Sequence, residues 1–169
     1  MRIWSHLQNL TARDCALALI LISLATISGA WIFEYFGYLP CELCLKQRWA
    51  YYIGVPLACV LFIILHLQIA HLPRIGFVVL MLLWIASSVF GIYHSGVEWQ
   101  FWPGPTDCTG SLTKAPSIND FLQQLQSVKV VRCDAVAIRI LGLSLAGWNA
   151  VLSLAMAIIA AMGFSKSRA

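Results

Sequence analysis

Charged side chains are scarce in this sequence. Only 11% of its 169 residues are Asp, Glu, Lys or Arg, whereas 60% are hydrophobic and the mean hydropathy is +0.81. A water-soluble domain carries about 25% charged residues, so this chain has too few polar side chains to cover a soluble globule. The same composition excludes intrinsic disorder and a collagen-like repeat. A net charge of +4 without a basic cluster excludes nucleic acid as a partner.

Four stretches of the sequence contain no charged residue at all. Each is at least 19 residues long, and a helix needs roughly 20 apolar residues to cross about 30 Å of hydrocarbon. Four such segments cannot all be hidden inside a soluble protein of this length. The sequence therefore predicts an all-α membrane protein, a single integral membrane domain over 1–169 that forms a four-helix transmembrane bundle. The expected spans lie near 15–33, 49–67, 74–94 and 142–163.

The basic residues predict the orientation of this bundle. Five basic residues and one acid lie in the N-terminus, the turn at 68–73 and the C-terminus. On the other side of the membrane, basic and acidic residues are equal in number. Basic residues concentrate in short cytoplasmic loops. Both termini are therefore expected on the cytoplasmic side of a bacterial inner membrane, with the loops 34–48 and 95–141 in the periplasm. Cleavage of the first span as a signal peptide is the alternative, although its apolar run exceeds the usual length of about 7–15 residues.

The longer outer loop, 95–141, contains two features of a membrane surface. Trp99 and Trp102 are typical of the interface between lipid and water. After Ser117, an expected N-cap, apolar residues recur at helical spacing over 118–128. This pattern predicts a short amphipathic helix, which lies on the membrane surface or packs on the outer ends of the spans.

The expected topology divides the six cysteines into two groups. Cys15 and Cys59 fall in apolar runs, where a cysteine is usually a small packing residue. The other four lie on the outer side, where an oxidising compartment favours disulfides. They are Cys41, Cys44, Cys108 and Cys133. A redox centre, two structural disulfides and a zinc site are all open interpretations of these four. No metal is expected, because the second pair has no histidine between its cysteines.

The C-x-x-C at Cys41 and Cys44 favours the redox interpretation. Its disulfide closes a very small ring, which makes the bond readily exchangeable. Lys46, Arg48 and the start of the second span would favour a thiolate at Cys44, because positive charge and a helix N-terminus lower a thiol pKa. Glu42, inside the motif, acts in the opposite direction.

Electrons that enter this motif need an acceptor. The sequence contains neither a C-x-x-C-H haem motif nor a G-x-G-x-x-G nucleotide loop. A lipid-soluble quinone beside the outer end of the second span is therefore the expected acceptor. Arg48 either donates hydrogen bonds to a quinone carbonyl or anchors the helix at the interface.

Taken together, these motifs resemble the disulfide bond formation protein B (DsbB) family, the quinone-coupled thiol oxidases of bacterial inner membranes. The resemblance extends over almost the whole chain. It is carried by the segment 40–48, by Trp102-Pro103-Gly104-Pro105 ahead of Cys108, and by Cys133-Asp134 with Leu141-Gly142-Leu143-Ser144 and Trp148.

The resemblance implies a series of thiol exchanges. A DsbA-like periplasmic thiol oxidase would pass its electrons to the second cysteine pair, with Cys108 forming the mixed disulfide. Cys133 would then link transiently to Cys41. Cys44 would carry the thiolate that interacts with a ubiquinone or menaquinone from the membrane pool.

Two further residues are implied as quinone-binding. Arg48 would assist at the quinone, and the family places a polar group such as His94 near it, at the outer end of the third span. Two other functions remain as alternatives. One is a membrane protein whose outer disulfides are only structural, and the other is a reductase that moves electrons outward.

Overall fold

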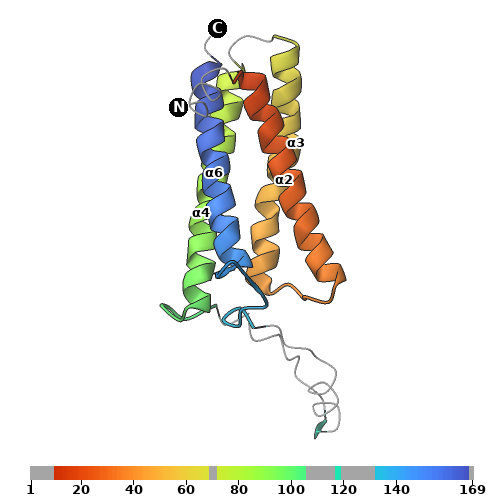
Figure 1. Cartoon of the computed structure of the whole chain (residues 1–169), viewed down its shortest axis with the longest axis vertical. Helices are drawn as coiled ribbons and strands as arrows, with labels where there is room; N and C mark the ends of the chain where they lie inside the picture. The colour runs from red at the N-terminus through yellow and green to blue at the C-terminus, as the bar shows by residue number, and fades with distance from the viewer. Residues whose placement is uncertain (1–9, 69–71, 106–116, 119–131, 168–169) are drawn as a thin grey trace.

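The structure is a computed structural model of the chain and describes residues 10–68, 72–105, 117–118 and 132–167. Within these residues, four α-helices are long and apolar enough to cross a membrane, which confirms the predicted all-α four-helix class (Figure 1). They are α2 (Ala12–Tyr35), α3 (Glu42–His66), α4 (Leu72–Glu98) and α6 (Leu145–Lys166). The start of α2 and the end of α6 lie at the same end of the bundle.

Capping side chains explain where two of these helices begin. Thr11 is the N-cap of α2, where its Oγ1 accepts the N–H of Asp14 at 3.2 Å and the Asp14 carboxylate accepts the N–H of Thr11 at 2.8 Å. Ser144 is the N-cap of α6, and its Oγ accepts the N–H of Gly147 at 3.1 Å. These bonds satisfy amides that the first helical turn leaves without an intrahelical partner.

Each helix of the bundle packs against two neighbours. α2 contacts α3, α3 contacts α4, and α4 contacts α6, which returns to α2. The most extensive contact joins α4 to α6, and small residues permit it. A Cβ at Gly91 would lie 2.9 Å from the backbone N of Ala150, and Ser88 donates to the carbonyl of Ala150 at 2.9 Å. Helices in membranes use small residues in this way to approach closely.

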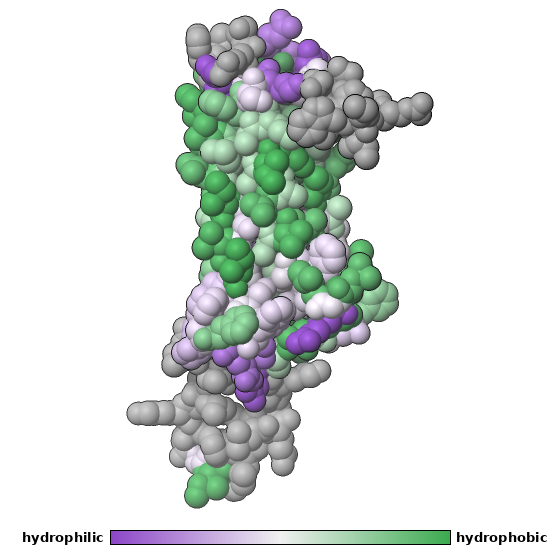
Figure 2. All heavy atoms as spheres, turned by 60° about the vertical axis from the view of Figure 1, so that its left-hand side comes forward, coloured by the Kyte–Doolittle hydropathy of each residue, from purple (hydrophilic) through white to green (hydrophobic). Residues whose placement is uncertain are grey.

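Large apolar side chains fill the core and also cover the outside of the bundle. Trp84 and Phe77 are completely buried, whereas Ile53, Ile63 and Ile75 are each more than half exposed. On the face shown in Figure 2, hydrophobic residues form a band between two more hydrophilic ends. A soluble monomer rarely exposes so large an apolar surface, so this band is the surface that faces lipid.

The second helix begins earlier than the sequence analysis expected. The expected span started at 49, whereas α3 starts at Glu42, so most of the expected loop 34–48 is helical. A charged residue interrupts an apolar run in the sequence, but the helix can continue through it. Lys46 lies 3.5 Å from Glu42 one turn away, and Arg48 pairs with Glu34 at 2.6 Å. The C-x-x-C therefore lies at the start of a helix rather than in a loop.

A small hairpin, which the sequence analysis did not predict, precedes the last helix. The strands β1 (Arg139–Ile140) and β2 (Leu143–Ser144) pair antiparallel, and both residues of the turn, Leu141 and Gly142, have positive φ. A two-residue turn with positive φ at both positions matches the right-handed twist of the strands that it joins. The fourth helix thus begins at Leu145 rather than 142. Nearly all of the amphipathic helix expected at 118–128 lies outside the described residues, so it stays a prediction.

Candidate active site

The two cysteines of the C-x-x-C occupy the first turn of α3. Cys41 is the N-cap, and its Sγ accepts the backbone N–H of Cys44 at 3.3 Å. The two Sγ atoms lie 3.1 Å apart, and both cysteines are free thiols. A helix N-terminus presents unpaired N–H groups and a partial positive charge. In this geometry both act most directly on the sulfur of Cys41.

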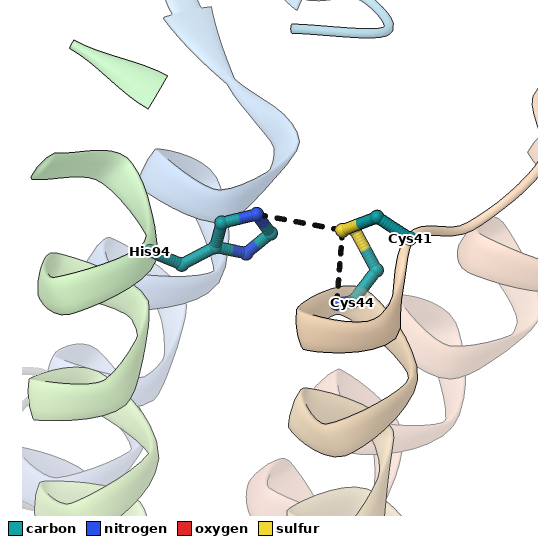
Figure 3. A group of neighbouring side chains, drawn as sticks. All are labelled: Cys41, Cys44 and His94. Atoms are coloured by element: carbon teal, nitrogen blue, oxygen red, sulfur yellow. Dashed lines mark hydrogen bonds between the residues drawn. The ribbon is translucent and has the colours of Figure 1, made fainter. Parts of the chain in front are cut away.

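His94 reaches Cys41 from the neighbouring helix α4. Its Nε2 lies 3.5 Å from the Sγ of Cys41, and Figure 3 shows the ring directed at that sulfur. Its Nδ1 lies 3.2 Å from Nε2 of Gln47, and the imidazole is only 1% exposed. An amide NH₂ group can only donate, so Nδ1 accepts and the ring proton is on Nε2. His94 thus donates towards Cys41.

These contacts lower the pKa of Cys41. The hydrogen bond from the thiol of Cys44 is the largest cause, and His94 and the backbone N–H of Cys44 contribute further. Burial of the sulfur acts in the opposite direction, yet the pKa falls from 9.0 to about 4. In the free dithiol, the geometry therefore favours a thiolate at Cys41. The sequence analysis placed the helix effect on Cys44 because it expected the helix to begin after the motif.

A buried carboxylate, which the sequence analysis missed, lies one turn beyond His94. Oε1 of Glu98 is 4.0 Å from Nε2 of His94, and its side chain is only 7% exposed. No group in the described part of the chain donates a hydrogen bond to Oε2 of Glu98. Glu98 lines a small cavity of about 30 Å³ together with Cys41, Cys44 and His94. The i, i+4 spacing from His94 is the signal that could have found it.

Cys133 belongs to the same part of the molecule. It is disulfide-bonded, 2% exposed, and packed in one buried cluster with Cys41, Leu43 and Val97. Cys44 packs against this cluster. The structure therefore brings three of the four expected catalytic cysteines together. Cys108, the fourth, lies outside the described residues.

A second, larger cavity lies on the other side of Cys44. Its volume is about 300 Å³, and residues of α2, α3, α6 and the segment before α6 line it. Most of its walls are apolar, but Cys44, Gln47 and Arg48 also line it. Arg48 donates from one N–H group to Glu34, which the sequence analysis did not pair with it. Of the two expected quinone-binding residues, Arg48 thus lines the large cavity and His94 the small one.

Comparison with known proteins identifies the family. A family model described as "Disulfide bond formation protein DsbB" matches residues 12–163.

The chain belongs to the DsbB family.

A protein of Rickettsia prowazekii (strain Madrid E) named "Uncharacterized protein RP370" is similar to this DsbB-family chain. The two are 30% identical over 146 residues, which are 84% of this chain and 81% of that protein. No solved structure matches the chain. The resemblance that the cysteine motifs indicated is thus confirmed by the match over nearly the whole chain.

Membership of the DsbB family implies the general class of activity. The chain is a membrane oxidoreductase of disulfide bond formation, in a pathway whose soluble partner is a DsbA protein. Four membrane-spanning helices fit a multi-pass protein of the bacterial inner membrane. The dithiol at the start of α3 is consistent with this class, since thiol–disulfide exchange needs a thiolate.

Proposed function

We propose that this DsbB-family protein oxidises a DsbA-like periplasmic protein and transfers the electrons through two cysteine pairs to a membrane quinone, ubiquinone or menaquinone. One observation carries the proposal. Cys44 lines both the small cavity that contains Cys41 and the large apolar cavity that contains Arg48. A single sulfur can therefore connect thiol exchange on one side with an electron acceptor on the other.

The partner reacts at the second cysteine pair. A thiolate of the DsbA-like protein attacks Cys108 in its disulfide with Cys133, and Cys133 leaves with the electron pair as a thiolate. The partner's second thiolate then attacks its own sulfur in the mixed disulfide. The partner departs oxidised, and Cys108 and Cys133 are left reduced. No other oxidant is needed for this step.

Electrons next pass to the first pair through Cys133 and Cys41, whose shared buried cluster supports direct exchange. Cys133 attacks Cys41 in the Cys41–Cys44 disulfide, a new sulfur–sulfur bond forms, and Cys44 leaves as a thiolate. Cys108 then attacks Cys133, which restores the second disulfide and releases Cys41 as a thiolate. An oxidised Cys133 beside free thiols at Cys41 and Cys44 is the product of this exchange.

The two cysteines of the first pair thus have different roles. While Cys41 is bound to Cys133, the free sulfur is that of Cys44, which lines the large cavity. Once Cys41 is released, hydrogen bonds from Cys44 and His94 hold its negative charge. A thiolate at Cys44 during exchange and one at Cys41 afterwards are therefore compatible.

The large cavity has the properties that a quinone ring requires. Small-molecule sites occupy about 300–1,000 Å³, and this cavity of about 300 Å³ has mainly apolar walls. Arg48 uses one N–H group on Glu34 and has others with which to hold a quinone carbonyl. A bound quinone supplies an acceptor for two electrons and two protons. His94 donates to Cys41, which supports a role in holding that thiolate in addition to its implied place near the quinone.

The proposal is tested with the purified protein in lipid nanodiscs. A ubiquinone or menaquinone analogue is supplied with a reduced DsbA-like protein, and quinone absorbance is followed over time. Turnover is expected in the wild type and should be lost in Cys44→Ser and in Cys108→Ala. A Cys15→Ser, Cys59→Ser double variant is the matched control and should retain turnover. A wild-type rate that persists in Cys44→Ser would instead support purely structural disulfides.

A further inference from the structure

We infer that the reduced Cys41–Cys44 pair forms, with His94 and Glu98, a binding site for Zn²⁺ that exists only in the dithiol state. The two thiol sulfurs and a ring nitrogen of His94 lie within 4.8 Å of one another. They come from two different helices, and Figure 3 shows the ring of His94 directed at the sulfur of Cys41, beside Cys44. The inference rests on this geometry and does not depend on the identity of the electron acceptor.

The distances between the ligand atoms fit a tetrahedral zinc ion closely. Zinc binds sulfur at about 2.3 Å and nitrogen at about 2.0–2.1 Å, which places neighbouring ligand atoms roughly 3.5–3.8 Å apart. The two Sγ atoms are 3.1 Å apart, and Sγ of Cys41 is 3.5 Å from Nε2 of His94. The two sulfurs would have to separate by about 0.7 Å, and Sγ of Cys44 lies within 4.8 Å of a ring nitrogen of His94.

Glu98 is the nearest candidate for a fourth ligand, although it lies outside the group of three whose ligand atoms are within 4.8 Å of one another and would have to move towards it. Its Oε1 is already 4.0 Å from Nε2 of His94, and it lines the same cavity as the three other ligands. Among the described residues, its buried Oε2 has no hydrogen-bond partner. The carboxylate has a hydrogen bond with Ser144, but a buried oxygen without a partner is unfavourable, so a cation at this position would compensate Oε2.

The surrounding groups are compatible with a cation. A zinc-bound Nε2 requires the ring proton on Nδ1, and Gln47 can accept that proton once its amide turns its oxygen towards His94. Arg132 also lines the small cavity. Its positive charge is offset by Asp134, which it contacts through Nε at 2.9 Å and through Nη2 at 2.5 Å.

Zinc binding at this site would be controlled by oxidation state. Cys44 releases its proton and binds beside the thiolate of Cys41, two Zn–S bonds and one Zn–N bond form, and no electrons are transferred. A Cys41–Cys44 disulfide contains no thiolate ligand, so the oxidised protein cannot bind zinc at this site. Bound zinc would in turn hold both sulfurs and prevent their oxidation, so excess zinc would stop electron flow at this pair.

Cadmium and cobalt, which report their ligands spectroscopically, test the site in the full-length protein. The reduced, chelator-treated protein in nanodiscs is titrated with Cd²⁺ and with Co²⁺, and zinc affinity is measured by competition with a chromophoric chelator. One equivalent is expected, with thiolate-to-metal charge-transfer absorption and cobalt bands of a tetrahedral site. Protein oxidised beforehand with a general chemical thiol oxidant, which does not require quinone turnover, should bind none.

Variants assign the ligands. Cys41→Ser and Cys44→Ser should abolish the charge-transfer absorption, and Gln47→Leu should weaken binding about 10–100-fold through loss of the contact to His94. The Cys108→Ala, Cys133→Ala double variant retains the first pair and should still bind. Circular dichroism verifies that each variant is folded, and Glu98→Gln is a mild variant that should weaken binding.

The outcomes distinguish this inference from the proposed function. Absence of stoichiometric binding to the reduced wild type would overturn the zinc site, and so would binding that disappears in the Cys108→Ala, Cys133→Ala variant but persists in Cys41→Ser. Quinone reduction by the metal-free protein would be unaffected by either result. Conversely, zinc binding without any quinone reduction would refute the proposed function and leave the site intact.

Discussion

Cys41 and Cys44 lie on one turn of helix but in different surroundings. Cys41 is 5% exposed and lines only the small cavity, whereas Cys44 also lines the large one. Cys41 receives hydrogen bonds from the start of α3 and from His94 on α4. The first pair therefore combines a sulfur that is stabilised as a thiolate with a sulfur that is placed beside the proposed acceptor.

The pH dependence of Cys41 follows from its lowered pKa. The groups that face its sulfur are Cys44, His94 and Glu98, with Arg132 lining the same cavity. Since its pKa is about 4 in the folded protein and 9.0 otherwise, ionisation stabilises the reduced fold above pH 9. This contribution is lost as the pH falls towards 4. We expect thiolate absorbance of the reduced protein to persist well below pH 9.

Ultraviolet titration of a Cys15→Ala, Cys59→Ala variant measures this absorbance without interference from the two packing cysteines. Replacing Cys41 by Ser in that background should remove the low-pH thiolate. A single transition near pH 9 in both proteins would contradict the assignment of the thiolate to Cys41.

The pair between Arg48 and Glu34 should affect quinone binding. The Arg48 side chain is 12% exposed and is oriented by a contact of 2.6 Å to Glu34. A hydrogen bond to a charged group contributes about 1.5–3 kcal/mol, so Arg48→Met should raise the quinone KM by about 10–100-fold. Glu34→Gln should raise it less, because the guanidinium remains but loses its orientation. Steady-state kinetics at varied quinone concentration checks both.

Lys46→Met is the matched control for these variants. Lys46 is half exposed and, within the described residues, pairs with Glu42 one turn away, so its removal should leave the quinone KM unchanged. Equal effects of Lys46→Met and Arg48→Met would indicate a general role of positive charge at the membrane surface.

At the scale of elements, the contact between α4 and α6 depends on the absence of a side chain at Gly91. A Cβ there would meet backbone and side-chain atoms of Ala150 at 2.9–3.0 Å, whereas a Cβ at Gly29 would meet nothing within 4 Å. Ala is favoured over Gly in a helix by about 1 kcal/mol. Gly29→Ala should therefore raise the thermal midpoint in detergent, while Gly91→Ala should lower it. Equal shifts would contradict the close packing.

The helices themselves could be predicted, but their ends and the hairpin could not. Uncharged runs identify a membrane-spanning segment because charge in hydrocarbon is costly. They do not mark where a helix begins, since Glu42, Lys46 and Arg48 lie at the membrane surface and stay helical. The turn at Leu141 was missed because a leucine with positive φ is uncommon and carries no turn signal.

The candidate site was predictable only in part. The cysteines were found from their motif and from the family resemblance, which rest on local sequence. Gln47 and Glu34 were missed because their partners, His94 and Arg48, lie on other helices. Glu98 lies one turn from His94 on α4 itself, so its spacing was available in the sequence, and only the contact of Gln47 with His94 depends on packing of α3 against α4.

At the scale of the whole molecule, the bundle has two ends of different chemistry. The hairpin and the start of α3 lie at one end, and the start of α2 and the end of α6 lie at the other (Figure 1). Both cavities are lined by Cys44, in the first turn of α3. Basic residues such as Arg13, Arg74 and Lys166 belong to the second end. The positive-inside rule therefore predicts that this end is cytoplasmic.

Thiol labelling of single-cysteine variants measures this orientation. Leu141 and Ser165 are both exposed and lie at opposite ends of the bundle. In a background without the native cysteines, Leu141→Cys should react with an impermeant maleimide in intact spheroplasts. Ser165→Cys should react only after lysis. The reverse pattern would place the redox site in the cytoplasm and refute the proposed function.

Cys44 lines both cavities, so in the proposed cycle the first pair would be loaded with electrons from one side and unloaded to the other. The protein would then alternate between an oxidised and a reduced form, each produced in one half-reaction. Initial rates plotted in double-reciprocal form at several acceptor concentrations should therefore give parallel lines, the signature of ping-pong kinetics.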